Sequence, residues 1–235
     1  MSYLNPATFL ELVQRLSIEA GVTDDPPATL VSASGQLLTF MNHINEASLE
    51  IQRLHDDWGF MRVRPGVSFT TIADQMTYTP TETGISAGIL TKWLTYTFRV
   101  YKTATGFPSE IPMTYYEYDD WRDQYEIGAL RTSRVQPVAF SVVPGDLSIA
   151  ISCPLAGYTI TGEYIKSPVG LTVDADASII PLQYRMAIVW KALMDYGTDE
   201  SSPEVYAKGT TKYDSLIRKM ETLRLPTISL AGPIA

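Results

Sequence analysis

The residue types that carry enzyme chemistry are few in this chain, and they do not form a known catalytic pattern. Its only histidines, His43 and His55, do not stand in the HExxH spacing that binds zinc on a helix. The single cysteine, Cys153, has no histidine or basic residue within a few positions, so nothing indicates a reactive thiolate. The GxSxG, GxxxxGK[ST] and GxGxxG motifs are absent from the sequence. We therefore expect no catalytic residue and no enzyme.

One acidic segment resembles the start of a calcium-binding loop. It spans Asp174–Ser178 and alternates acidic and small residues. The sixth position would be Ile179, where the loop needs glycine, and the twelfth would be Arg185, where it needs a bidentate glutamate. We expect a polar loop before a helix, with no metal and no cofactor.

A second cluster combines acids with aromatic rings. Its acids are Asp119, Asp120 and Asp123, and its rings are Tyr115, Tyr116, Tyr118, Trp121 and Tyr125. For the acids we favour a solvated surface patch, with a metal site as the alternative. The rings suit a tail or subunit interface, because Tyr and Trp supply large contact area with a polar edge. A sheet face packed within the subunit is the competing interpretation.

Composition and charge indicate a globular protein that does not bind nucleic acid specifically. Hydrophobic residues make up 45% and charged residues 19% of the chain, and the net charge is −8. Residues 1–57 hold eight acids against two bases, and residues 208–224 hold five bases against two acids. No apolar run has the roughly 18 residues of a membrane span. The first residues lack the pattern of a secretory signal, so we expect folding in a cytoplasm.

Helical signals stand at both ends of the chain. Thr8 and Glu11 predict a capping box for a first helix that stops at Gly21. An apolar seam from Leu37 to Trp58 predicts a second helix from about Gln36 to Asp57, ended by Gly59. We expect this seam to pack on the other helices, with a subunit interface as the alternative.

The C-terminal helices are predicted in the same way. One should begin at Pro181 and stop at Gly197, and it is apolar on more than one face. The last should open at Pro203 and end before Pro226. Along one side it should carry Tyr206, Tyr213, Leu216, Met220 and Leu223.

Residues between these helices alternate as strands do, and Pro144-Gly145-Asp146 marks a turn. We expect an α+β fold: a helical bundle with an inserted small antiparallel β-sheet or barrel. The expected parts are N-terminal helices over 1–59, a β insertion over 60–170, C-terminal helices over 171–224 and an extended tail over 225–235.

The segment Ile180–Gly197, with the sequence IPLQYRMAIVWKALMDYG, resembles the C-terminal helical segment of podovirus-type phage head-to-tail adaptor proteins. So do the acidic linker, the basic helix and the Leu225-Pro226 exit that follow it. The N-terminal helices and Trp58-Gly59-Phe60 are similar as well. The resemblance covers about half of the chain and includes no catalytic signature.

This resemblance implies a structural protein of the virion neck. Its subunits would form a dodecameric ring beneath the portal, extend the DNA channel without binding DNA specifically, and offer a surface to a tail or nozzle protein. It implies no membrane contact. The portal-docking candidates are the bases of the last helix and the apolar residues of the tail: Lys208, Lys212, Arg218, Lys219, Arg224, Leu225, Ile228, Leu230 and Ile234.

Cations near a helix C-terminus also complement the helix dipole without any partner, so the basic helix has a second explanation. Two other functions stay open. The chain could be another neck or tail component, such as a tail terminator or nozzle subunit. It could also be a soluble carbohydrate-binding protein that uses the aromatic β region.

Overall fold

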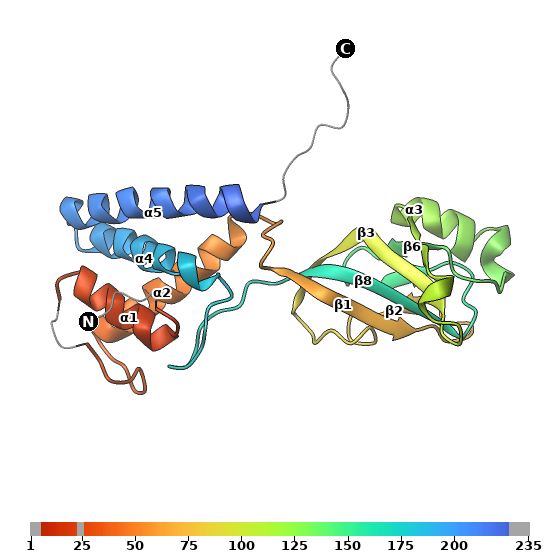
Figure 1. Cartoon of the computed structure of the whole chain (residues 1–235), viewed down its shortest axis with the longest axis horizontal. Coiled ribbons are helices and arrows are strands. Elements are labelled where there is room, and N and C mark those ends of the chain that lie inside the picture. The colour runs from red at the N-terminus through yellow and green to blue at the C-terminus, as the bar shows by residue number, and fades with distance from the viewer. Residues whose placement is uncertain (1–5, 23–25, 226–235) are drawn as a thin grey trace, which may run out of the picture. The chain divides into compact units, whose positions relative to one another are not determined.

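The computed structural model describes residues 6–22 and 26–225, which form two compact units. The described residues before 62 and after 167 form one unit, which is helical. Residues 62–167 form the other, which is built mainly from strands (Figure 1). The described chain is therefore α+β, as the sequence predicts, with its β residues inserted between two helical segments.

Helix α1 (Phe9–Glu19) begins as the sequence predicts. The Thr8 side chain accepts from the Glu11 amide, and the Glu11 carboxylate accepts from the Thr8 amide, so the capping box is complete. Its apolar side chains, among them Leu12 and Leu16, are buried. Gly21 follows with a φ of 71°, a left-handed conformation that glycine adopts without strain.

Helix α2 (Gln36–Arg53) ends before the predicted Asp57. Leu54, expected on the packed seam, is 45% exposed, whereas Trp58 beyond the helix is fully buried. The Trp58 indole nitrogen donates to the Ile51 carbonyl oxygen at 2.9 Å. The chain therefore folds back on the last turn of α2, because burying this large ring gains more than continuing the helix.

Helix α4 (Met186–Asp199) starts later than Pro181, after a short 3-10 turn, and it continues through Gly197. The prediction that Gly197 stops this helix was wrong. Close packing of the next helix explains why this residue is a glycine, because a Cβ at position 197 would lie 2.7 Å from the Tyr206 backbone nitrogen.

Helix α5 (Pro203–Arg224) packs antiparallel against α4 (Figure 1). Its buried residues are Gly209, Ile217 and Met220. Of the residues predicted along one side of this helix, Met220 is fully buried, whereas Tyr206 is 44% and Leu223 67% exposed. Glycine at position 209 lets the helix axes approach more closely than side chains would allow.

The β unit contains two four-stranded sheets and no closed barrel among its described residues. The first sheet has the order β1-β8-β3-β4, and its strands are β1 (Arg62–Thr70), β8 (Tyr158–Lys166), β3 (Leu90–Lys102) and β4 (Ile111–Pro112). The second has the order β2-β7-β6-β5, with β2 (Thr77–Tyr78), β7 (Ile149–Ile151), β6 (Ala139–Val142) and β5 (Thr114–Tyr115). The sheets are antiparallel, as predicted, except that β5 pairs with β6 in parallel at one edge.

The core of this unit joins residues of both sheets, as in a β-sandwich. Phe98 of β3 stacks on Phe140 of β6 with ring centroids 4.4 Å apart. Gly162 of β8 makes room for the Phe98 ring, since a Cβ there would lie 2.7 Å from Cζ. Helix α3 (Tyr118–Trp121) packs beside β6, and a π-helical turn over Arg122–Glu126 follows it directly.

Candidate assembly surfaces

The bases of α5 fall into two groups. Lys208 is engaged within the subunit: its Nζ lies 2.8 Å from Glu19 Oε2 and 3.1 Å from the Glu19 carbonyl oxygen. The Arg224 guanidinium lies over the Tyr184 ring, 5.9 Å from its centroid. Three bases form the other group, and in the described chain no acid pairs with them. These exposed bases are Lys212, Arg218 and Lys219.

The position of these bases follows from helix geometry. At about 100° per residue, Lys208, Lys212 and Lys219 fall within about 40° of one another around the axis, whereas Arg218 lies about 80–120° away from them. The buried Gly209, Ile217 and Met220 lie on another side of α5. The helix therefore presents one basic stripe to solvent.

Acids of the N-terminal segment are partly neutralised inside the subunit. Glu50 pairs with Lys191 at 3.0 Å, and Asp195 holds the same ammonium at 2.8 Å. Burial lowers the pKa of Lys191, but the hydrogen bonds to Asp195 and Glu50 outweigh it and raise the pKa overall. The Lys208–Glu19 pair acts in the same way. Acids of the N-terminal helices thus pair with bases of the C-terminal helices and hold the helical unit together.

Both histidines lie against residues of their own helical unit. His43 is 8% exposed, and its Nε2 lies 3.4 Å from Asp199 Oδ2 without making a hydrogen bond. His55 Nε2 lies 2.9 Å from Glu221 Oε1, and its ring meets Trp58 edge-on at 4.8 Å. The two rings are thus packed between helices of the same unit.

The aromatic residues of the β unit divide by exposure. Trp121 and Tyr125 are 2% and 8% exposed, and they pack with Ala139, Ala150 and Cys153. Tyr115 is 36% exposed on β5, an edge strand, and its hydroxyl donates to Glu117 at 3.3 Å. Burial, and then the Glu117 charge, raise the pKa of Tyr115. The contact area available to a partner is therefore Tyr115 with the half-buried Tyr116 and Tyr118.

The acids of this region surround one guanidinium. Arg122 pairs with Asp119 at 2.9 Å and with Asp123 at 3.3 Å. The side-chain hydrogen bond to Asp123 contributes most to the raised pKa of Arg122. In the described ranges, no three acids, histidines or cysteines are grouped as a metal site would require.

The loop before α4 uses its acids for backbone hydrogen bonds. Asp176 accepts from the amides of Val173 and Thr172 at 2.8 and 2.6 Å, and these bonds lower the pKa of its carboxyl group. Asp174 accepts from the Leu30 amide at 3.1 Å and from the Thr29 hydroxyl at 2.6 Å. The loop is thus held to the N-terminal segment by its own carboxylates.

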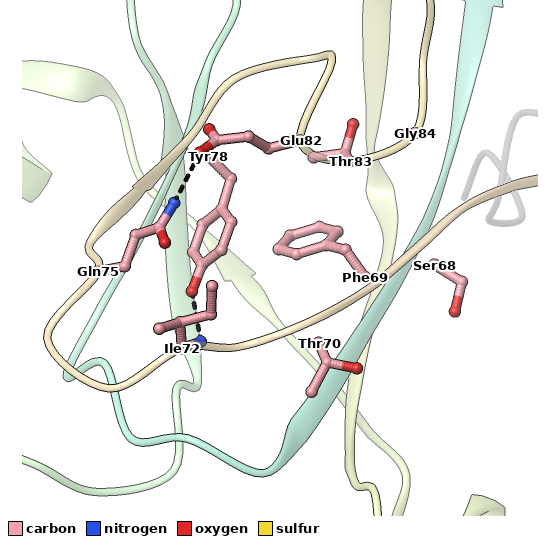
Figure 2. A pocket seen from close by; sticks show the side chains of 9 residues that line it. All are labelled: Ser68, Phe69, Thr70, Ile72, Gln75, Tyr78, Glu82, Thr83 and Gly84. Carbon is pink, nitrogen blue, oxygen red and sulfur yellow. Dashed lines mark hydrogen bonds between the residues drawn. The ribbon is translucent and has the colours of Figure 1, made fainter.

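Sequence reasoning missed a pocket of about 370 Å³ in the β unit (Figure 2). It is lined by residues 68–70 of β1 and by residues of the following segment, from Ile72 to Gly84. The sequence indicates only that strands occur in this region, and it does not show which of them lies at a sheet edge.

Of the predicted apolar docking residues, Leu225 is half-buried and extended, with φ −85° and ψ 152°. Ile228, Leu230 and Ile234 lie outside the described residues. No helix in the described part of the chain is long and apolar enough to cross a membrane.

Comparison with known proteins identifies a family across nearly the whole chain. A search of curated proteins returned no match. The model of the family described as SU10 adaptor protein matches residues 7–231, which include the helices at both ends and the whole β unit. The chain therefore belongs to the SU10 adaptor protein family, a family of structural phage head-to-tail adaptors.

Proposed function

We propose that this protein is the head-to-tail adaptor of a tailed phage and forms a dodecameric ring on the portal. The ring prolongs the DNA channel, and its outer end receives a tail or nozzle protein. The subunit is made in the host cytoplasm and ends in the virion neck. The observation that carries this proposal is the family match over residues 7–231, since it includes both units.

The helical unit is proposed to form the body of the ring and to bind the portal. The supporting feature is the basic stripe of α5, where Lys212 and Lys219 are exposed, together with the exposed Arg218 on a neighbouring side of the helix. The apolar residues that follow the helix would complete the contact: Leu225, Ile228, Leu230 and Ile234. Lys208 and Arg224 would contribute less, because contacts within the subunit already hold them.

The β unit is proposed to face outward or toward the tail. Tyr115, Tyr116 and Tyr118 would contact the tail or a neighbouring subunit. The buried Trp121 and Tyr125 would support this surface, because Tyr116 and Tyr118 pack against their cluster. A self-closing ring requires two different faces of each subunit to meet. Complementary charge would help to set the register of that contact.

DNA is proposed to pass through the ring without specific binding. The net charge of −8 supports this, because few clustered bases are available for phosphates. The measurement is retention of double-stranded DNA by the isolated ring at low salt. Tight retention would contradict this part of the proposal.

Native mass spectrometry with and without purified portal protein tests the assembly. We expect a twelve-subunit species that binds portal. In the double variant Lys212→Glu with Lys219→Glu, portal binding should weaken and depend less on salt. Lys102→Glu with Arg131→Glu is the matched control, since it makes the same double charge reversal at exposed positions of the β unit.

Order of addition separates an adaptor from a tail terminator or nozzle subunit. An adaptor binds portal-bearing heads before any tail protein is present. If the chain binds only to heads that already carry tail proteins, the proposed function is wrong.

A further inference from the structure

The pocket of the β unit lies against the free edge of a sheet. Strand β1 is the outer strand of the order β1-β8-β3-β4. Three consecutive β1 residues line the pocket, although their side chains alternate between the two faces of the strand. Figure 2 shows Phe69 pointing toward Tyr78, while Ser68 and Thr70 point away. A pocket that touches all three must therefore lie along the strand's edge.

The main chain of β1 offers unused hydrogen-bonding groups at this edge. Thr71 donates to the Tyr158 carbonyl of β8, and the register pairs Phe69 with Ile160 and Val67 with Gly162. In an antiparallel ladder the residues between such pairs direct their N–H and C=O groups the other way. Ser68 and Thr70 therefore point theirs outward, as a strand that awaits a partner does.

Both ends of this open edge are closed. The next outward amide, that of Ile72, donates to the Tyr78 hydroxyl at 2.8 Å, so the phenol takes the place of a partner carbonyl. At the other end Pro65 has no N–H to offer, and the ladder is irregular between Val63 and Val67. The available edge is thus a short stretch, which suits an added segment of a few residues.

The floor of the pocket is apolar and rigid. The Phe69 and Tyr78 rings lie 4.8 Å apart and are 7% and 2% exposed. Thr83 holds the facing loop, because its hydroxyl donates to the Pro80 carbonyl at 2.7 Å and its amide to the Thr79 carbonyl at 3.1 Å. The volume of about 370 Å³ falls at the small end of the roughly 300–1,000 Å³ of ligand pockets.

One carboxylate stands at the mouth of the pocket in a held position. Glu82 accepts from the Thr79 amide at 2.7 Å and from the Thr79 hydroxyl at 2.8 Å. It also accepts from the Gln75 amide group at 3.1 Å (Figure 2). These bonds, the Thr79 amide first, lower the pKa of Glu82. No base pairs with this carboxylate in the part of the chain that the structure describes. A charge so oriented favours a cation on the incoming segment.

We propose that this edge of β1 is a strand-addition site for an extended segment of a different protein. That segment would place an aliphatic side chain over Phe69 and Tyr78 and a Lys or Arg beside Glu82, and its main chain would pair with Ser68 and Thr70.

The edge strands that the structure describes in a second copy of this chain do not supply such a segment. The other edge strands, β2, β4 and β5, have two residues each and contain no Lys or Arg. Strand β1 does carry bases, but pairing of β1 with itself is isologous and closes at two subunits, which does not build a ring. The inference does not need the proposed function, because it depends on the β unit alone.

In the test, peptides that bind the full-length chain are selected from a library of random heptapeptides. The affinity of the enriched peptides is then measured by fluorescence polarisation. We expect enriched peptides to alternate apolar and polar residues and to include a Lys or Arg. Ser68→Pro with Thr70→Pro should weaken binding at least about tenfold, because it removes two outward N–H groups. The matched control, Ser68→Ala with Thr70→Val, keeps both amides and should bind normally.

Two further measurements keep the inference testable if the proline variant does not fold. Glu82→Gln should weaken binding about threefold and reduce its salt dependence. Hydrogen exchange at the Ser68 and Thr70 amides should slow when a selected peptide binds. The inference fails if no such peptides are enriched, if the proline variant folds and binds as the wild type does, or if these amides exchange unchanged. It also fails if their protection rises with protein concentration alone, because a second copy would then fill the edge.

Discussion

Gly209→Ala tests the close crossing of α4 and α5, on which the position of the basic stripe depends. A Cβ at this position would lie 2.9 Å from the Trp190 carbonyl oxygen and 3.0 Å from the Met194 amide nitrogen. Both are backbone atoms, so the helices must separate by about half an ångström to restore van der Waals contact. Overpacking of this kind costs about 1–3 kcal/mol, and alanine regains up to about 1 kcal/mol in helix propensity.

We therefore expect a net loss of about 1 kcal/mol, and of about 2 kcal/mol at most, in the free energy of unfolding of the helical unit. Thermal unfolding followed by circular dichroism at 222 nm measures it, because the long helices all belong to this unit. The expected fall in Tm is roughly 3–10 °C.

Ser215→Ala on the exposed face of α5 is the matched control. It gains helix propensity without a new contact, so its Tm should stay the same or rise slightly. If Gly209→Ala is as stable as the wild type or more stable, the helices do not cross at the distance described, and the reasoning is refuted.

Three further changes have defined outcomes. Deletion of residues 225–235 should leave the subunit folded but abolish its stable attachment to portal-bearing heads, and normal co-sedimentation of the truncated protein with heads would contradict the tail's proposed role. Arg185→Lys should lower the free energy of unfolding of the helical unit by about 2–3 kcal/mol. The guanidinium donates to the carbonyls of Ile180, Ser178 and Ala7, and an ammonium cannot reach all three. An unchanged denaturant midpoint would refute this. Burial raises the pKa of Tyr213 to about 12. The neutral Tyr213 hydroxyl therefore contributes fully to the free energy of unfolding below about pH 10. This contribution is lost as the pH rises through about 12. Tyr213→Phe should remove that part of the alkaline loss, measured as Tm against pH, and identical profiles would count against the assignment.

Local signals in the sequence predicted local structure well. The capping box of Thr8 and Glu11 forms because both partners lie within one turn, so no distant residue decides it. Pro203 opens α5 for the same reason, since its preset φ and missing N–H suit the first turn of a helix.

Signals that depend on distant contacts were misjudged. Gly197 has the composition of a helix stop, yet it stays helical because Tyr206 of the next helix packs directly against it. Helix α2 ends early because Trp58 turns back to reach the Ile51 carbonyl. In both cases tertiary packing outweighed the local preference of the chain.

The sequence by itself determined that the chain lacks recognisable catalytic motifs, that helices flank a β region, and that the last helix is basic. These features depend on residue type and short-range spacing. Only the tertiary structure decided that Lys208 is engaged while Lys212 and Lys219 remain exposed, and that Trp121 is buried while Tyr115 is not. It alone showed that β1 lies at an edge, because strand order arises from pairing between residues about 90 positions apart, such as Phe69 with Ile160.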